Sequence, residues 1–381
     1  MWSPDLTDDE LNRLMLYNFD PNLQIQLRER YIRGDLSEES NKLRGRIEVP
    51  PTSSVEDLPP PGSLKEQEAV EIGSEAIVRG KVALLILNGG MATRFGGAVK
   101  GIVPVVGGLS FLGLRLTAVR LLAERLDAEL PIYVMNSIAT HEKTLHHLRD
   151  SGYFGYPSDL VMPFLQNTLL RLTNDGNIFR TPDGSVSPYG PGHGDVAEAI
   201  LRDPLKDMKA RGVEALYMSN VDNVLATPDP VMFGMHLLRG ADMTIEVVPN
   251  TGRDVGGAPA LVDGKMQIVE AFRLPQCFPA EQLHDFNTNT FCFNPSSLKR
   301  DFPLSWFVVT KIIRSGHVIQ FERLAGQLSE SLSTHFLRVD RSGPDSRFCP
   351  IKDRLTLQSE RNRIVGTLTQ RGFLPTESQL H

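Results

Sequence analysis

Apolar runs alternate with amphipathic stretches between residues 82 and 220, and this alternation predicts a parallel sheet wrapped by helices. Residues 82–87 (VALLIL) are apolar without interruption, as expected of a strand that is buried on both faces. Residues 110–126 place leucines along one helical face, and Ser110 is suited to cap that helix. The pattern continues with a strand at 131–137, a helix at 139–149, a helical stretch at 195–211 and a strand at 215–220.

The second half of the chain predicts antiparallel strands that are added to this core. Strand-like segments lie at 244–249, 259–262 and 265–270. Asp263 and Gly264 separate the last two segments, and this pair is typical of a two-residue hairpin turn. The chain then returns to the core at 290–294 and forms a helix at 353–370. We therefore predict an α/β protein with a mixed, mostly parallel sheet flanked by helices, and with an antiparallel β insertion.

Prolines separate a helical N-terminal extension from the main body of the chain. Residues 7–18 begin with a threonine and acids and then place apolar residues at helical spacing; two further short helical stretches are expected before residue 46. Residues 47–63 contain five prolines, which exclude a regular helix and indicate a linker. We predict an extension with its Pro-rich linker at 1–63, a main domain at 64–345 and a short C-terminal segment at 346–381.

Composition and charge narrow the class of protein. Of the 381 residues, 41% are hydrophobic and 23% are charged, which is typical of a folded globular chain. The formal charge of −6 lacks the basic surplus of a nucleic-acid binder, and no apolar run approaches the roughly 20 residues of a membrane span. The acidic N-terminus and three widely spaced cysteines favour a cytoplasmic protein with free thiols. We therefore expect neither nucleic acid nor a membrane as a partner.

The most informative segment is the loop that follows the first buried strand. Residues 87–101 (LNGGMATRFGGAVKG) hold five glycines within 13 positions, together with Arg94 and Lys100. Glycines allow backbone N–H groups to approach a ligand, and the cations suit a polyphosphate. The loop is not a P-loop, because Lys100 follows Val99 rather than a glycine, and it is not a dinucleotide fingerprint, because Met91 occupies its second glycine position.

The GGxxTR core of this loop resembles that of the sugar nucleotidyltransferases, and further blocks resemble one branch, the UTP–glucose-1-phosphate uridylyltransferase family. The blocks follow the family order and together span residues 85–353. They are LNGG (87–90) with Lys100, VMNS (134–137), FLQNTLLRL (164–172), GPGHGD (190–195), SNVDN (219–223), TGRDVGGAPAL (251–261), FNTNTF (286–291) and SRFCPIKD (346–353). The resemblance implies a Rossmann-like, GT-A-like nucleotidyltransferase domain at 64–345. It also implies that UTP and glucose 1-phosphate are converted to UDP-glucose and pyrophosphate.

The resemblance also assigns roles by position. It implies that Asp222, beside the nucleotide, holds Mg²⁺, an ion that binds one or two carboxylates together with phosphate oxygens. Lys100 and Lys352 are the implied cations at the reacting phosphates, and Arg94 joins them because a guanidinium can clamp a phosphate. The amide of Gln166 is implied to read the uracil edge. The other implied nucleotide contacts are Leu87, Asn88, Gly89, Gly90 and Gly192, and the implied sugar or phosphate contacts are His193, Asn220, Glu270, Asn287 and Asn289.

Two positions depart from the family pattern, and alternatives remain open. Val99 stands where the family usually has proline. No lysine separates Val255 from Gly256, where the family often has one, and this departure puts one phosphate contact of the family in doubt. The alternatives are a pyrophosphorylase for another UDP-sugar, such as UDP-N-acetylglucosamine or UDP-galactose, and a non-catalytic sugar-nucleotide sensor on the same fold. A monomer and a small homo-oligomer are equally compatible with the sequence.

Overall fold

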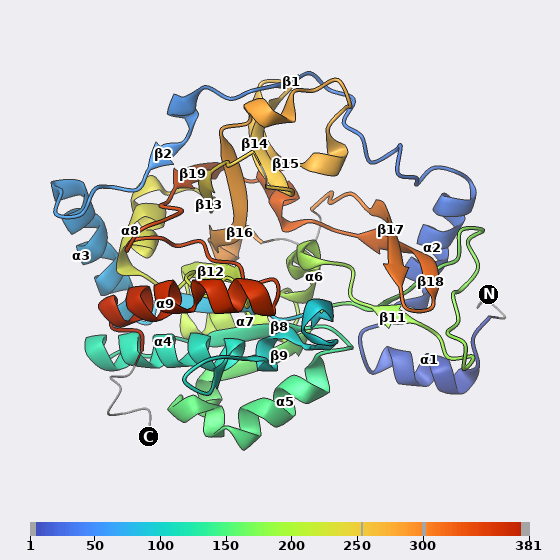
Figure 1. The fold of residues 1–381 in the computed structure, drawn as a ribbon, viewed down its shortest axis with the longest axis horizontal. Coiled ribbons are helices and arrows are strands. Elements are labelled where there is room, and N and C mark those ends of the chain that lie inside the picture. The colour runs from blue at the N-terminus through green and yellow to red at the C-terminus, as the bar shows by residue number, and fades with distance from the viewer. Residues whose placement is uncertain (1–4, 253, 299–301, 375–381) are drawn as a thin grey trace.

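A mixed sheet forms the centre of the computed structural model, which describes residues 5–252, 254–298 and 302–374 (Figure 1). In order across the sheet, its strands in these ranges are β2 (Glu56–Asp57), β19 (Thr334–Arg338), β13 (Met243–Pro249), β16 (Asp285–Phe293), β12 (Ala215–Asn220), β3 (Val82–Leu87), β8 (Ile132–Asn136) and β9 (Val161–Leu165). Among these described strands, β16 alone runs antiparallel to its neighbours, β12 and β13. The predicted mixed, mostly parallel sheet is confirmed.

Helices cover both faces of this sheet. Every residue of β3 is buried, with Val82, Leu84 and Ile86 in one hydrophobic cluster and the alternate residues in another. The helices that pack into the first cluster are α3 (Leu64–Val78), α4 (Phe111–Leu126), α5 (His141–Asp150), α8 (Pro230–Arg239) and α9 (Arg354–Gln370). The second cluster is covered by α6 (Val196–Ala199) and α7 (Asp203–Arg211). Burial on both faces explains why the strand is apolar throughout.

Local sequence signals set the ends of several elements. Ser110 caps α4 as predicted, because its Oγ accepts a hydrogen bond of 3.0 Å from the backbone N–H of Gly113. The helical stretch predicted at 195–211 is instead two helices, α6 and α7. Pro204 lies in the first turn of α7, where its missing N–H costs no helical hydrogen bond, and this position begins a new helix.

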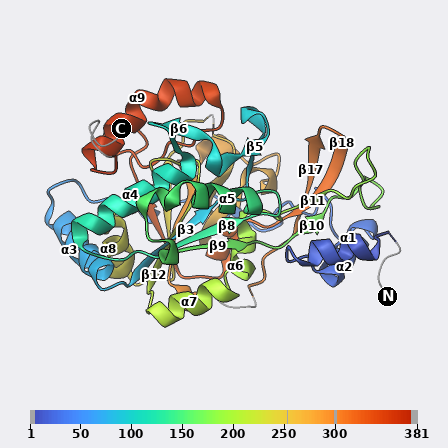
Figure 2. The same ribbon diagram turned by 90° about the horizontal axis from the view of Figure 1, so that it is seen from below.

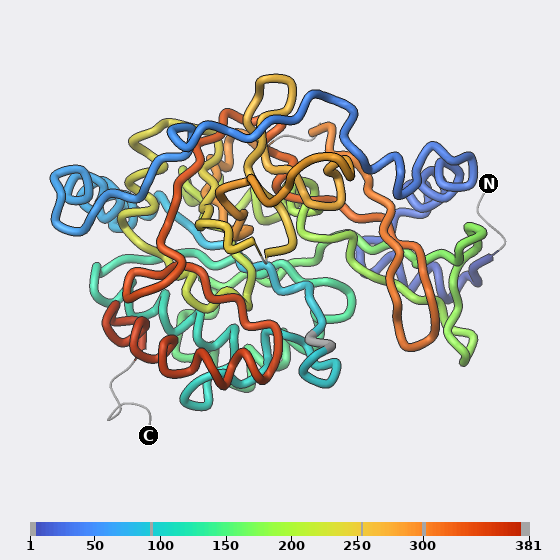
Figure 3. The backbone as a smooth tube through the Cα atoms, turned by 45° about the horizontal axis from the view of Figure 1, so that its top comes forward, coloured from blue at the N-terminus to red at the C-terminus, as the bar shows by residue number. Residues whose placement is uncertain are grey.

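The antiparallel insertion follows β13 and consists of β14 (Gly257–Val262) and β15 (Lys265–Glu270). Asp263 and Gly264 both adopt positive φ, at 50° and 81°, which is the backbone geometry of a two-residue hairpin turn. The short strand β1 (Ile47–Glu48) pairs with β14, and β2 pairs with β19. The Pro-rich segment at 47–63 therefore lies along the edges of two sheets on its way to α3, and Figure 3 shows it as the blue tube along the top.

The N-terminal helices lie at one end of the molecule, beside a hairpin that the sequence analysis did not predict (Figure 2). The helices are α1 (Asp8–Met15) and α2 (Pro21–Ile32), and the hairpin consists of β17 (Phe307–Ile313) and β18 (Gly316–Glu322). A second strand pair, β10 (Leu169–Leu170) with β11 (Pro188–Tyr189), lies beside them. Only one helix, α2, follows α1 in the described part of the extension, where two helical stretches were expected.

The predicted N-terminal extension and C-terminal segment include residues 1–4 and 375–381, which lie outside the described residues. No helix in the described ranges is long and apolar enough to cross a bilayer.

Helices α3 and α8 cross at two glycines. A Cβ atom on Gly73 would lie 1.8 Å from the carbonyl oxygen of Pro230, and a Cβ atom on Gly234 would lie 1.8 Å from that of Ala69. Both distances are far below any van der Waals contact, so the backbones of the two helices approach each other only because these side chains are absent. This close crossing of α3 and α8 holds α8 against the core beside β12, the strand that ends at Asn220.

We expect Gly73→Ala and Gly234→Ala to destabilise the fold by about 1–3 kcal/mol each, because an overpacked contact between two backbones has no side chain that can move aside. The matched control is Gly366→Ala in α9, where the added Cβ meets no atom within 4 Å. That variant should gain about 0.5–1 kcal/mol from helix propensity. Urea denaturation followed by circular dichroism measures all three, and equal stabilities for Gly73→Ala and Gly366→Ala would disprove the close crossing.

Candidate active site

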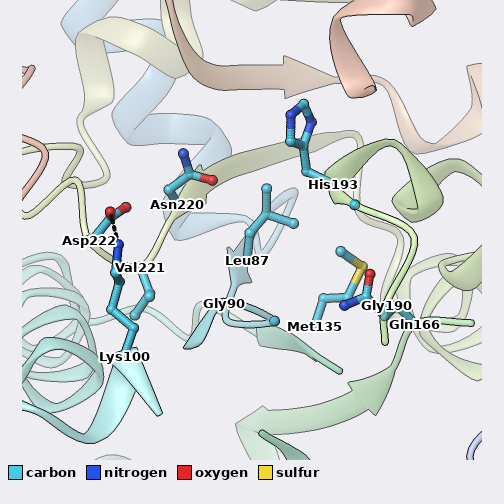
Figure 4. A pocket seen from close by; sticks show the side chains of 12 residues that line it. Leu87, Gly90, Lys100, Met135, Gln166, Gly190, His193, Asn220, Val221 and Asp222 are labelled. Atoms are coloured by element: carbon cyan, nitrogen blue, oxygen red, sulfur yellow. Dashed lines mark hydrogen bonds and ion pairs between the residues drawn. The ribbon is translucent and has the colours of Figure 1, made fainter. Parts of the chain in front are cut away.

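The site lies where the sheet reverses its strand order. The chain leaves β3 towards β8 on one side and returns to β12 on the other, which opens a crevice at the carboxyl ends of β3 and β12. A cavity of about 360 Å³ occupies that position (Figure 4). Its lining residues are Leu87, Gly89, Gly90, Lys100, Met135, Gln166, Gly190, Gly192, His193, Asn220, Val221 and Asp222.

A second cavity of about 210 Å³ adjoins the first and shares His193, Asn220 and Asp222 with it. We call the two the loop-side cavity and the insertion-side cavity, because the glycine loop lines the first and the insertion lines the second. The remaining lining of the insertion-side cavity comprises Asn223, Gly256, Gly257, Glu270, Phe286, Asn287, Thr288, Asn289, Phe348, Pro350 and Lys352. All the predicted site residues except Asn88 and Arg94 line one or both cavities.

Asn88 lies beneath the glycine loop and not in the cavity wall. Its Nδ2 donates to Oδ1 of Asn136 at 2.8 Å and to Oγ1 of Thr144 at 2.9 Å, and the residue is fully buried. A Cβ atom on Gly101 would lie 2.1 Å from Oδ1 of Asn88, so the loop rests on this side chain. The side chain of Asn88 therefore supports the loop from the protein interior, and its predicted contact with the nucleotide is not part of the cavity geometry.

Arg94 is exposed on a 3₁₀ turn of the glycine loop and lines neither cavity. It lies within electrostatic reach of Asp353, the residue after Lys352. The pKa of Asp353 lies below its ordinary value chiefly because the backbone N–H and the hydroxyl of Thr356 donate to it, with a smaller effect from the Arg94 guanidinium. Arg94 thus lies on the side of the loop that faces the C-terminal segment.

An ion pair joins the two strand ends at the site. Nζ of Lys100 lies 2.6 Å from Oδ2 of Asp222, and the two side chains are 19% and 14% exposed (Figure 4). The backbone N–H of Lys100 donates to the carbonyl of Gly90 at 3.3 Å, which closes the glycine loop. The loop after β3 therefore supplies a cation to the carboxylate that follows β12.

Hydrogen bonds from its backbone N–H groups tie the C-terminal segment to the loop after β12. The N–H of Ile351 donates to the carbonyl of Asp222 at 3.0 Å, and the N–H of Cys349 donates to Oδ1 of Asn223 at 2.8 Å. These bonds fix the backbone that carries Lys352, whose exposed side chain lines the insertion-side cavity. A lysine remote in sequence is thereby brought to the same cavity wall as Asp222.

Two buried arginines brace this region, and the sequence analysis missed both. Arg347 is 2% exposed and pairs with Glu246 at 3.1 Å, while its guanidinium also donates to Oη of Tyr217 at 2.8 Å. Arg115 is 1% exposed and donates to Oγ of Ser219 at 2.6 Å and to the carbonyl of Asn223 at 3.0 Å. Burial lowers the pKa of Arg115 to about 10, so the side chain remains charged at neutral pH.

Arg115 could have been noticed in the sequence. It interrupts the run Leu112–Leu116 of an otherwise apolar helix face, and a charge at such a position needs a buried partner. Here the partners are the hydroxyl of Ser219 and the backbone carbonyl of Asn223, which lie before and after Asp222 in the sequence. The guanidinium of Arg115 therefore positions the loop that carries the Asp222 carboxylate. Within the described residues, Arg115 makes no ion pair with a carboxylate.

Gln166 lies between two glycines in the wall of the loop-side cavity. A Cβ atom on Gly89 would lie 2.5 Å from Nε2 of Gln166, and one on Gly190 would lie 2.2 Å from it, so neither position has room for a side chain. Gln166 is 4% exposed, and its Oε1 has no hydrogen-bond partner among the described residues. A buried acceptor without a partner, on a residue of the cavity wall, indicates a position that a polar ligand or water would satisfy.

Asp195 holds the segment that carries this glutamine. Its carboxylate accepts from the backbone N–H of Asn167 at 2.6 Å and from Nδ2 of the same residue at 3.0 Å. Asp195 is fully buried, and burial raises its pKa to about 6. The last residue of the GPGHGD block therefore positions the glutamine segment, whereas its glycines and histidine line the cavity.

His193 presents a neutral imidazole to both cavities. Its Nδ1 accepts from the backbone N–H of Ala325 at 3.0 Å, and burial lowers its pKa to about 4. With Nδ1 acting as acceptor, the proton of the neutral ring lies on Nε2, which is therefore a donor. Gly192 before it has φ of 92°, and a Cβ atom there would lie 2.8 Å from the carbonyl oxygen of Arg323, so glycine is required at this turn.

The start of β16 forms one wall of the insertion-side cavity. Nδ2 of Asn289 donates to Oδ1 of Asn220 at 2.9 Å, and Oδ1 of Asn287 accepts from the backbone N–H of Asn289 at 3.0 Å. A bulge interrupts the pairing here, since Glu246 pairs with Thr290 but the next residue of β13 pairs with Asn287. Asn289 sits in the bulge with φ of 55°, which turns its side chain towards the end of β12.

Glu270, at the end of β15, lies in the same cavity with its carboxylate close to the insertion backbone. A Cβ atom on Gly257, its strand partner, would lie 2.7 Å from Oε1 of Glu270. Burial raises the pKa of Glu270 to about 7, and the opposing attraction of Arg273 is smaller. The carboxyl group can therefore act as a donor or as an acceptor near neutral pH.

Sequence reasoning assigned no role to the other lining residues, although they all belong to the matched blocks. Most of them are glycine, proline or apolar residues, and these types alone do not indicate contact with a ligand. These residues are Met135, Gly190, Val221, Asn223, Gly256, Gly257, Phe286, Thr288, Phe348 and Pro350.

A family model described as UTP–glucose-1-phosphate uridylyltransferase matches residues 25–365 of the chain. The chain belongs to this family. Proteins named UTP–glucose-1-phosphate uridylyltransferase from Solanum tuberosum and Saccharomyces cerevisiae are each 29% identical to it, over 77% and 74% of this chain and over 64% and 60% of their own length. UTP–glucose-1-phosphate uridylyltransferase 2 of Dictyostelium discoideum is 30% identical over 81% of this chain and 62% of its own length. The chain thus spans about three fifths of these relatives.

Solved structures of UDP-sugar pyrophosphorylases share the fold. The crystal structure of UDP-glucose phosphorylase from Trypanosoma brucei matches with a TM-score of 0.73 and 21% identity, over 92% of this chain and 77% of that one. The uridine diphosphate N-acetylglucosamine pyrophosphorylase of the same organism matches with a TM-score of 0.73 and 19% identity, over 88% and 75% of the two chains. The chain therefore has the nucleotidyltransferase fold of this family, as the sequence blocks predict.

The raised pKa of Glu270 predicts a pH-dependent difference in stability between the wild type and Glu270→Gln. In the unfolded chain this carboxyl ionises near its ordinary pKa of 4.5, whereas in the folded protein it ionises near 7. The wild type therefore loses stability relative to Glu270→Gln as the pH rises from about 5 to 7, and the difference levels off above that range. Urea denaturation at several pH values measures it.

The control for this series is Glu281→Gln, which removes a carboxylate from an exposed position. Its difference from the wild type should change little over the same pH range. A stability difference for Glu270→Gln that stays constant with pH would show that the carboxyl is not held in its protonated form by burial.

Proposed function

We propose that this protein transfers a uridylyl group from UTP to glucose 1-phosphate and releases pyrophosphate. The observation that carries the proposal is the meeting of two cavities at Asp222, with a glycine loop and Lys100 on one side and Lys352 with the asparagines of β16 on the other. Relatives of the same family bear the name of this activity. One cavity would take the nucleotide and the other the sugar.

The loop-side cavity suits uridine. Uracil presents both an acceptor and a donor along one edge, and the amide of Gln166 can match both. Its Oε1 is buried and has no partner in the described part of the protein, so pairing with the base would satisfy it. Gly89 and Gly90 at the end of β3 leave the nucleotide free access to the backbone, and Gly190 and Gly192 do the same across the cavity.

In the reaction, an oxygen of the sugar phosphate attacks the α-phosphorus of UTP, and the bond from the α-phosphorus to the bridging oxygen breaks as pyrophosphate leaves. The nucleophile is already ionised at neutral pH, so no general base is needed. The main obstacle is repulsion between two anions, and positioning and charge neutralisation overcome it. Lys100 and Lys352 supply positive charge at the cavities, and Arg94 adds charge from the outer side of the glycine loop.

The residues present fit a Mg²⁺ ion that is shared with the substrates. Within the described residues, no group of three or more His, Cys, Asp or Glu side chains could hold a metal by itself. Asp222 is a single carboxylate in the wall common to both cavities, and Mg²⁺ commonly binds one or two carboxylates and completes its shell with phosphates and water. Asp222 would hold the ion in place of the Lys100 ammonium, which now lies 2.6 Å from its carboxylate, and a bound Mg²⁺ would neutralise phosphate charge.

Polar groups at the insertion-side cavity suit a sugar. Asn220, Asn287 and Asn289 provide amides, Glu270 provides a carboxyl that can donate or accept, and Nε2 of His193 is a donor. Sugar hydroxyls both donate and accept, so such a mixed set recognises them. Since other UDP-sugars differ from UDP-glucose by only one or two groups, a panel of sugar 1-phosphates distinguishes them.

The experiment that tests the function is a pyrophosphate-release assay with UTP and a panel of sugar 1-phosphates. We expect turnover with glucose 1-phosphate to exceed that with N-acetylglucosamine 1-phosphate and galactose 1-phosphate. We also expect UTP to be preferred over CTP, because cytosine reverses the donor and acceptor that face Gln166 and a polar site rejects such a mismatch. Preference for another sugar would change the substrate, and binding of UDP-glucose without turnover would indicate a sensor.

The roles of Asp222 and Lys352 predict two different kinetic defects. Lys352→Ala should lower kcat by about 10²–10³-fold with little change in KM, as for loss of a group that stabilises transition-state charge. Asp222→Asn keeps the shape but removes the charge, so it should lower kcat and also raise the Mg²⁺ concentration needed for half-maximal activity. Steady-state kinetics with a Mg²⁺ titration separates the two.

The control is Lys209→Ala, which removes an exposed lysine on α7 and should leave the kinetics unchanged. Circular dichroism checks that each variant is folded. A folded Asp222→Asn with wild-type activity and an unchanged Mg²⁺ titration would remove the metal from the proposed mechanism.

A further inference from the structure

A third cavity, of about 350 Å³, lies between the N-terminal extension and the segment that leads into β17. We call it the extension cavity. Three cations line it, and each comes from a different part of the chain: Arg30 from α2, Lys42 from the turns after α2, and Arg273 from the 3₁₀ turn that follows Glu270. None of its residues lines the loop-side or the insertion-side cavity.

Arg273 is the buried anchor of this cavity. It is 6% exposed, and its guanidinium lies over the ring of Phe307 at 5.0 Å. One of its terminal nitrogens donates to Oε1 of Glu330 at 2.7 Å, but its Nε is buried and has no hydrogen-bond partner among the described residues. A buried donor without a partner indicates a position that water or a ligand satisfies.

The other two cations are not neutralised locally. Arg30 makes no side-chain hydrogen bond or ion pair with any described residue, and Lys42 donates only to the carbonyl of Leu274, at 3.0 Å. The acidic residue in the lining, Asp35, is engaged by Arg33 at 3.1 Å. The described lining therefore carries an excess of positive charge, with N–H donors still available on all three cations.

We propose that the extension cavity binds a phosphate group, as inorganic phosphate or as a small phosphate ester. Arginine guanidinium and lysine ammonium groups form short, charge-assisted hydrogen bonds with phosphate oxygens, and convergence of three such groups from separate segments creates a defined anion site. The cavity volume of about 350 Å³ leaves room for the phosphate together with a small organic group.

The cavity is joined to the proposed sugar site by a short piece of backbone. Glu270 precedes the 3₁₀ turn Ala271–Arg273 and faces the insertion-side cavity, while Arg273 at the end of the same turn lines the extension cavity. An anion bound to Arg273 would therefore contact the turn that positions Glu270. This proposal does not depend on which sugar nucleotide the protein makes, or on whether it catalyses a reaction.

The experiment is isothermal titration of inorganic phosphate into the full chain, at constant ionic strength maintained with chloride. The wild type is compared with Arg30→Gln/Lys42→Gln, which removes the exposed Arg30 and the half-buried Lys42 of the site, and with Lys100→Ala/Lys352→Ala, which removes the cations of the proposed active site. We expect the dissociation constant to rise at least tenfold in Arg30→Gln/Lys42→Gln, and a binding event to persist in Lys100→Ala/Lys352→Ala.

The matched control is Lys209→Gln/Arg361→Gln, which changes the net charge by the same amount at exposed positions outside the cavities. Its dissociation constant should stay within about twofold of the wild type. The proposal is overturned if the wild type shows no binding at phosphate concentrations up to about 10 mM, roughly tenfold above a dissociation constant of 1 mM. It is also overturned if Arg30→Gln/Lys42→Gln binds phosphate as tightly as the wild type does. Loss of binding only in Lys100→Ala/Lys352→Ala would also overturn it, because the phosphate would then occupy the active site.

Discussion

The hydrogen bonds that the backbone of residues 349–351 donates to the loop after β12 are the constraint on which the candidate site depends. They attach a segment from the end of the chain to Asp222 and Asn223, and so bring Lys352 to the same cavity wall as the carboxylate. A surface lysine alone would be free to point into solvent. Here its backbone is fixed on both sides, by the buried Ile351 before it and by the helix cap at Asp353 after it.

Buried charged side chains hold the C-terminal segment against the sheet, although burying a charge costs desolvation free energy. Arg347 and Glu246 are both about 2% exposed, and a buried ion pair of this kind often adds little net stability compared with apolar residues of the same size. What it provides is position, because the guanidinium also reaches Tyr217 in β12 and joins the C-terminal segment to two strands of the sheet. Arg115 likewise fixes position, because it joins α4 to Ser219 at the end of β12 and to Asn223 in the loop that follows.

The parts of this fold that could be predicted are those where local sequence and tertiary environment agree. The apolar run of β3, the Ser110 cap and the Asp263–Gly264 turn each carry their own physical signal, and the structure contains all three. The hairpin β17–β18 carries a weaker signal, because its outer residues are exposed and its apolar positions pack against segments far away in the sequence, namely the N-terminal extension and β10 with β11. Asn88 was assigned to the ligand because it lies in the loop motif, but its side chain is buried beneath that loop.

Strand direction explains why the insertion lies beside the site. The parallel strands β3 and β12 end at the ligand edge of the sheet, and β13, which is parallel to β19 and antiparallel to β16, ends at the same edge. The chain must therefore leave the sheet there, and it forms β14 and β15 before it re-enters as β16. Because β16 runs in the opposite direction, its first residues, and not its last, reach the ligand edge. Asn287 and Asn289 are thus delivered to the cavity by the single reversed strand among the described strands of the main sheet.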